Sequence, residues 1–138
     1  MATKLPANYK PNNDEPFMNA KQREYFRLKL HNWREGLLQE SSATLQYLQQ
    51  ESVNAPDIAD RASMEAERSV ELRTRDRARK LITKIDDALG RIEDGSYGYC
   101  VETEEPIGIR RLEARPIATL SVEAQERHER LERTYRDV

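Results

Sequence analysis

Two carboxylates stand three residues apart near the middle of the chain, at Asp57 and Asp60. Such a pair is able to hold a magnesium ion, although one short pair is weak evidence for a metal site. The same residues also suit the start of a helix, where Asp57 would cap the first turn and Asp60 would lie near the positive end of the helix dipole. The two roles are compatible, so the pair is at once a candidate site and a candidate helix start.

Charge around this pair is separated by sign along the chain. Five acidic residues face one arginine between Gln50 and Glu67, and seven basic residues face two acidic ones between Arg68 and Lys84. A solvated helix face with ion pairs such as Asp76 and Lys80 would explain isolated charges. It would not explain why acidic and basic residues are separated into two consecutive stretches. The blocks favour an acidic tip that enters a basic or metal-containing cavity while a basic shaft rests on an acidic rim.

Cys100 is the one cysteine of the sequence. A single thiol excludes an intramolecular disulfide, and it excludes a zinc site built from two or more thiolates within a monomer. Free cysteines are among the residues most often buried, so we expect Cys100 to be a small buried apolar side chain rather than a redox sensor.

The composition limits the fold that must position these residues. The chain has 138 residues, of which 35% are charged and 37% hydrophobic, with a net charge of −2. This supply of apolar residues excludes a large single core and favours long helices with one narrow apolar seam. Because no run of eighteen apolar residues and no signal-peptide pattern occurs, we expect a cytoplasmic protein without a membrane span.

Apolar residues recur at helical spacing in two long stretches. The first stretch begins at Asn19, a good helix cap with Gln22 three residues later, and the second ends at Gly95. The first seam is Phe26, Leu30, Trp33 and Leu37 and continues less cleanly through Leu45 and Leu48. The second seam is Leu81, Ile85, Leu89 and Ile92. Pro56 separates them, which predicts two antiparallel helices, each about 50 Å long, joined by a turn.

These patterns predict an all-α fold, with a long antiparallel coiled-coil hairpin on a small globular domain. Residues 1–16 hold three prolines among polar residues, and we expect a flexible arm there. We assign residues 17–94 to the hairpin, with its tip near 53–62, and residues 95–138 to the globular domain.

The globular domain is expected to hold a short hairpin and turn over 95–120, followed by a final helix. Ser121 has the residue type of a cap for this helix. One face of the helix should pack on the base of the hairpin, because it carries Ala124, His128, Leu131 and Tyr135 at helical spacing.

Four segments carry distinctive motifs, which lie at 57–62 (DIADRA), 71–77 (ELRTRDR), 98–100 (GYC) and 107–116 (IGIRRLEARP). In these motifs the chain resembles the DksA/TraR (DnaK suppressor) family of transcription factors, and the last motif is the most specific. The resemblance implies a coiled-coil hairpin inserted into the secondary channel of bacterial RNA polymerase. It further implies regulation of transcription initiation with guanosine tetraphosphate in the stringent response, without enzymatic activity and without sequence-specific DNA binding. We expect a monomer.

The resemblance also implies roles for residues of the hairpin. Asp57, Asp60 and Ala62 match the tip that faces the polymerase active site. Arg73 and Arg77 match shaft residues that contact the polymerase rim. The alternative is that these residues only cap a helix or are solvated arginines.

Two cations correspond to family residues that help to hold guanosine tetraphosphate at the polymerase interface, Lys84 and Arg115. Cations suit a polyphosphate, and arginine binds phosphate oxygens with two hydrogen bonds. The alternative is pairing with the nearby acids Asp86, Asp87 or Glu113. A third family cation falls at Gln125, and this departure places the strength of the nucleotide effect in question. Either the affinity for the nucleotide is lower, or another residue such as Arg111 or Arg127 compensates.

Family members carry four zinc-binding cysteines at positions that here read Cys100, Thr103, Ser121 and Ala124. Hydroxyls are poor zinc ligands and a methyl group is none. The resemblance is therefore to the cysteine-poor branch of the family, with a degenerate zinc finger over residues 100–124 and no metal. We expect a factor that works without zinc.

Other classes of protein remain open at this point. A Gre-like factor that stimulates transcript cleavage would use the same polymerase channel and is the main alternative. A purely structural coiled coil is a second. A DNA-binding protein is the least favoured, because the acidic net charge offers no broad surface for phosphate contacts.

Overall fold

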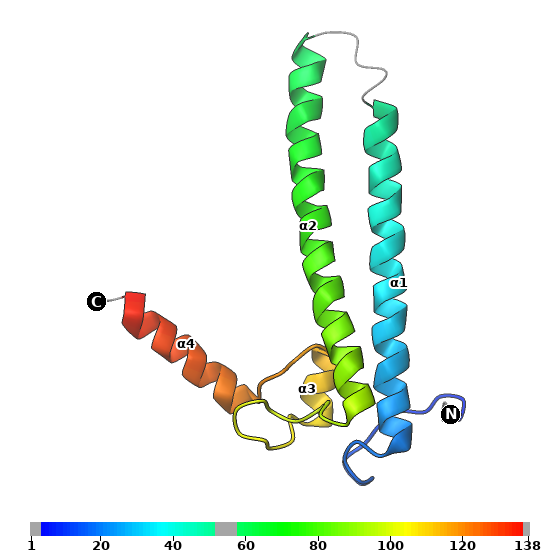
Figure 1. Ribbon diagram of the computed structural model, residues 1–138, viewed down its shortest axis with the longest axis vertical. Coiled ribbons are helices and arrows are strands. Elements are labelled where there is room, and N and C mark those ends of the chain that lie inside the picture. Colours follow the sequence, from blue (N-terminus) through cyan, green and yellow to red (C-terminus); the bar gives the residue numbers. More distant parts are fainter. Residues whose placement is uncertain (1–3, 52–57, 137–138) are drawn as a thin grey trace. The chain divides into compact units, whose positions relative to one another are not determined.

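The computed structural model describes residues 4–51 and 58–136. These residues form four helices, α1 (Ala20–Glu51), α2 (Ile58–Asp94), α3 (Ile109–Ala114) and α4 (Val122–Arg136), as Figure 1 shows. Within these ranges the only β pairing is an isolated antiparallel bridge between Tyr99 and Pro106. The predicted all-α class is confirmed. No helix in the described ranges has the length and apolarity needed to cross a membrane.

The chain divides into two compact units. We call Met1–Leu30 together with Asp87–Val138 the core unit, and His31–Asp86 the hairpin unit. The helices α1 and α2 each contribute to both units, so the start of α1 and the end of α2 belong to the core unit. The predicted boundaries near residues 16 and 94 stay a prediction.

In the hairpin unit, α1 and α2 run alongside each other in opposite directions (Figure 1). Arg34 Nε donates to Asp86 Oδ1 at 2.8 Å and so links the two helices. Ile85 is fully buried, Trp33 and Leu37 are half-buried, and Leu45 is exposed. Burial therefore declines along the predicted seam, as expected for a narrow two-helix contact.

Two side chains, those of Asn19 and Gln22, cap the start of α1. Asn19 Oδ1 accepts from the backbone N–H of Gln22 at 2.9 Å, as predicted. The Gln22 side chain accepts from the N–H of Met18 at 2.7 Å instead of that of Asn19, and it donates to the carbonyl of Asn12 at 3.1 Å. Gln22 is fully buried, and these bonds satisfy both ends of its amide.

The described part of the N-terminal arm, residues 4–16, contacts α1. The Tyr9 hydroxyl donates to Glu15 at 2.7 Å, and its ring meets the Tyr25 ring edge to face at 6.2 Å. Asn19 donates to the same Glu15 carboxylate at 3.0 Å. These contacts hold the arm at Tyr9 and Glu15, while its flexibility stays a prediction.

The core unit is built around buried side chains from the start of α1 and the end of α2. Phe26, Leu30 and Ala88 are fully buried, and the Phe26 ring lies 5.8 Å from that of Tyr97. Burying a Phe or Leu side chain contributes about 1.5–3 kcal/mol, so this cluster is the main source of stability in the unit. The Tyr97 hydroxyl donates to the Pro116 carbonyl at 2.8 Å, which holds the loop after α3 against the core.

The segment after α2 forms the predicted short hairpin and then a helix that the periodicity did not predict. The N–H groups of Cys100 and Ile107 donate to the carbonyls of Glu105 and Gly98 at 2.8 and 2.7 Å. The additional helix is α3, whose six residues bury Ile109 and Leu112. A helix this short leaves too few turns for a periodic signal.

The helix α4 begins as predicted but packs differently. Ser121 Oγ accepts from the N–H of Ala124 at 3.2 Å, and Ala124 is fully buried. The rest of the predicted packing face is wrong, because Leu131 and Tyr135 are 57% and 81% exposed. Within the first turn of α4, Ala124 is the buried residue, whereas Val122 is 50% exposed.

Candidate functional site

The structure brings the four degenerate zinc-ligand positions together in the core unit. Hydrogen bonds from the Thr103 hydroxyl and from the backbone N–H of Ser121 reach the sulfur of Cys100. Ser121 in turn caps the helix turn that contains the buried Ala124. Hydrogen bonds therefore connect three of the four positions around one sulfur, and the fourth, Ala124, lies in the turn that Ser121 caps.

Cys100 is 2% exposed, as predicted, but its surroundings are polar. Burial by itself would raise the pKa of the thiol. Hydrogen bonds from the Thr103 hydroxyl and from the backbone of Ser121, Thr103 and Glu102 outweigh burial and lower the pKa from 9.0 to about 6. These donors stabilise the thiolate form, because hydrogen bonds to the charged form of an acid favour that form.

The donor set does not fit a structural zinc ion. Such sites need four ligands from thiolate, imidazole or carboxylate groups, and the four positions offer one thiol, two hydroxyls and a methyl group. Within residues 4–51 and 58–136, no three His, Cys, Asp or Glu residues lie close enough to hold a metal.

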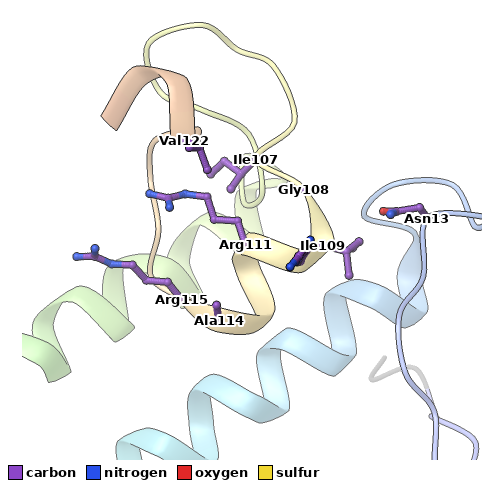
Figure 2. A pocket seen from close by; sticks show the side chains of 9 residues that line it. Asn13, Ile107, Gly108, Ile109, Arg111, Ala114, Arg115 and Val122 are labelled. Carbon is purple, nitrogen blue, oxygen red and sulfur yellow. The ribbon is translucent and has the colours of Figure 1, made fainter. Parts of the chain in front are cut away.

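An open cavity with a volume of about 540 Å³ lies beside α3 in the core unit. Its polar lining is dominated by arginines, with no acidic residue among the lining residues. Figure 2 shows the side chains of Arg111 and Arg115 extending to the same side of α3 in that view. The lining residues are Asn13, Ile107, Gly108, Ile109, Arg110, Arg111, Ala114, Arg115 and Val122.

Among the residues that line this cavity, the sequence pointed to Arg115 as a site residue and to Arg111 as a cation that could compensate for Gln125. Arg110 and Arg111 are adjacent in the most specific motif, and this pair of cations was the signal in the sequence that could have pointed to the cavity. Arg111 Nε donates to the carbonyl of Leu120 at 2.9 Å, which fixes its position against the loop before α4. No pattern in the sequence pointed to Asn13, which reaches the cavity from the arm.

Both predicted nucleotide-binding cations are exposed, and no ion pair involves either of them in the described part of the chain. Two of the three acids proposed as alternative partners are engaged elsewhere, since Asp86 pairs with Arg34 and Glu113 pairs with Lys29. Lys84 lies in the hairpin unit, whereas Arg115 lies in the core unit beside the cavity.

The predicted tip and rim residues all belong to the hairpin unit. Asp57 lies outside the described residues, and of Asp60 only the backbone, in the first turn of α2, is described. Ala62, Arg73 and Arg77 are exposed on α2. Arg73 donates to the Ser69 hydroxyl at 3.3 Å, a weak contact that leaves most of its donors available.

Comparison with known proteins decides the family. Residues 22–92 match the family described as DnaK suppressor protein DksA, N-terminal domain, and residues 95–130 match the prokaryotic dksA/traR C4-type zinc finger. The RNA polymerase-binding transcription factor DksA of Caulobacter vibrioides (strain NA1000 / CB15N) is 65% identical over 131 residues, 95% of this chain and 92% of that protein. The chain belongs to the DksA family.

Two further members of the DksA family cover most of the chain. The RNA polymerase-binding transcription factor DksA of Escherichia coli (strain K12) is 46% identical over 117 residues, 85% of this chain and 78% of that protein. The solved structure of transcription factor DksA2 from Pseudomonas aeruginosa is 42% identical, with a TM-score of 0.80 over 90% of this chain and 94% of that one. The second match confirms the fold class.

Proposed function

We propose that this chain binds bacterial RNA polymerase and regulates transcription initiation as a monomeric, non-enzymatic cytoplasmic factor. The observation that carries the proposal is the 65% identity, over 95% of the chain, to an RNA polymerase-binding transcription factor DksA. Identity that extends across both the helical hairpin and the finger supports a shared activity of the whole chain.

The proposed mechanism inserts the hairpin tip into the secondary channel of the polymerase. The helices α1 and α2 contain 32 and 37 residues, and at about 1.5 Å per residue each is roughly 50 Å long. In the proposal Asp57 and Asp60 face the active site, with Ala62 beside them. A difference of about 1–3 kcal/mol in tip contacts between two promoter-complex conformations is sufficient for a several-fold to hundredfold shift in their populations.

The shaft of the hairpin is proposed to rest on the rim of the channel through Arg73 and Arg77. Both side chains are exposed, and no ion pair within the described ranges occupies them. Exposed cations that are not committed within the chain remain available to an acidic surface of a partner.

We further propose that Lys84 and Arg115 help to hold guanosine tetraphosphate between this chain and the polymerase. The absence of competing ion pairs at either cation within the described part supports this, as do the arginines of the cavity beside Arg115. Gln125 stands where the family has a third cation, so either the affinity for the nucleotide is lower than in members that keep this cation, or another residue such as Arg111 or Arg127 compensates.

The proposal includes activity without zinc, and the donor set around Cys100 supports it. Metal analysis of the purified chain should find less than one zinc per ten chains, and a chelator should leave transcriptional activity unchanged. Stoichiometric zinc, or inactivation by a chelator, would contradict this part of the proposal.

The decisive experiment is transcription in vitro from a ribosomal-type promoter, with and without guanosine tetraphosphate. We expect the chain to reduce the transcript several-fold, more strongly with the nucleotide, and we expect Asp60→Asn to lose this effect while it still binds polymerase. A Gre-like factor would instead release 3′ fragments from arrested complexes, so that assay separates the two functions. A structural coiled coil would be indifferent to Asp60→Asn.

A further inference from the structure

The helix α4 is joined to the rest of the core unit at few points. Its first turn buries Ala124, whereas the side chains from Glu126 through Tyr135 are exposed. In the described part of the chain, one polar side-chain contact links α4 to another segment, and it joins His128 Nε2 to Glu102 Oε1. This contact is therefore the one polar side-chain link that can bias the orientation of α4 among the described residues.

The same contact spans the two segments that a metal would join in a C4-type finger. A zinc ion would connect the loop at positions 100 and 103 with the start of α4 at positions 121 and 124. Glu102 lies between the first two positions, and His128 lies one helical turn after Ala124. A backbone bond from Val101 N–H to the Thr119 carbonyl, at 3.0 Å, approaches the same junction from the other side.

We infer that the Glu102–His128 pair takes over part of the cross-link that a metal would supply, and that it is the positioning contact for α4. The inference rests on the metal-free finger of the proposed function. It assigns Glu102 and His128 a role in holding the finger closed, which neither the zinc-ligand spacing nor the tip mechanism requires.

The size of the expected effect follows from exposure. The side chains of His128 and Glu102 are 45% and 41% exposed, and partly solvated pairs contribute modestly. A pair of this kind shifts a local opening equilibrium roughly two- to fivefold. This is too little to unfold the unit when it is lost, but it is sufficient to change how often the junction opens.

Hydrogen exchange of the full-length chain tests the inference directly. The reporting amides are those of Val101 and Gln125, which are bonded to the carbonyls of Thr119 and Ser121. We expect His128→Ala and Glu102→Ala each to speed their exchange about two- to fivefold, and the double variant to be no faster than either single one. Unchanged exchange in the single variants, or additive effects in the double variant, would overturn the inference.

Two matched variants control for local effects of the substitutions. Glu104→Ala removes an exposed carboxylate from the same loop, and Arg127→Ala replaces the neighbour of His128 in α4. Neither residue contacts another segment through its side chain in the part of the chain that the structure describes. Both variants should leave the exchange of Val101 and Gln125 within about 1.5-fold of the wild-type rate, a change smaller than a surface pair produces.

Rebuilding the metal site provides the second test. The triple variant Thr103→Cys, Ser121→Cys, Ala124→Cys restores four thiols around position 100, and with zinc bound it should make His128→Ala nearly silent in the same exchange measurement. Equal sensitivity to His128→Ala in the zinc-loaded triple variant would overturn the inference. The single and double variants still decide the inference if the triple variant takes up no zinc. Since exchange is measured on the free chain, a failure of polymerase binding would not affect the result.

Discussion

Lys29 of α1 holds the last turn of α3 by two bonds to a single residue, Glu113. Its Nζ donates to the Glu113 carbonyl at 3.0 Å and to the Glu113 carboxylate at 2.8 Å, across 84 residues of sequence. The carbonyl is one of those that a helix end leaves unpaired, so Lys29 also caps α3. This contact fixes the helix that carries Arg111 and that ends directly before Arg115.

Loss of the Lys29–Glu113 contact should destabilise the core unit. Both side chains are about one third exposed, so we expect Lys29→Met to cost about 0.5–1 kcal/mol in the free energy of unfolding. Urea unfolding followed by circular dichroism measures this. Lys80→Met, on the exposed face of α2, is the control and should change stability by less than about 0.5 kcal/mol. Equal effects of the two variants would contradict the structural role of Lys29.

Alanine should have opposite effects at two glycines. Gly98 has a φ of +93°, and a Cβ there would lie 2.9 Å from Met18 Cγ and 3.2 Å from Phe17 Cζ. We expect Gly98→Ala to cost about 1–3 kcal/mol. Gly90 lies within α2 with nothing within 4 Å of a Cβ, so Gly90→Ala should stabilise by about 0.5–1 kcal/mol. Thermal unfolding of both variants gives the sign of each effect.

The stability of the chain should depend on pH through Cys100. Burial opposes the thiolate but hydrogen bonds outweigh it, so the folded-state pKa is about 6 against an ordinary value of 9.0. Because the folded chain binds the proton less tightly than the unfolded chain, this contribution is complete above pH 9. It declines as the pH falls toward 6 and is lost below that value.

Comparison of wild type with Cys100→Ala isolates this effect from other titrating groups. The difference in the free energy of unfolding between the two proteins should grow steadily from pH 6 to pH 9. A constant difference over this range would mean that only the packing of the sulfur matters, and it would contradict a stabilised thiolate.

The nucleotide effect should depend on Arg115 more than on a neighbouring cation outside the cavity. We expect Arg115→Ala to reduce the stimulation by guanosine tetraphosphate about tenfold or more, because it removes a charge-assisted contact to phosphate. Inhibition without the nucleotide should be retained. Arg130→Ala, on the exposed face of α4, is the control, and equal losses in both variants would argue against a site at Arg115. Transcription in vitro over a range of nucleotide concentrations measures the effect.

Local order along the chain was sufficient to predict much of this fold. The caps at Asn19 and Ser121 and the seam through Phe26 and Leu30 depend on contacts between residues three or four apart, which helical geometry fixes wherever they occur. The family motifs added the assignment of site residues, because such strings carry information that periodicity lacks. The tip residue Asp57 lies outside the described part and stays a prediction.

Contacts between distant segments could not be predicted in the same way. The helix α3 is too short to leave a periodic signal and depends on Lys29, which lies far away in sequence. The face of α4 has the spacing of a packed stripe, yet Leu131 and Tyr135 are exposed because no described segment of the core unit covers them. Hydrogen-bond donors gather around Cys100 only when the loop and the start of α4 fold together. In each case the stabilising energy depends on contact between two surfaces. The residue spacing within one segment does not show which other segment will contact it.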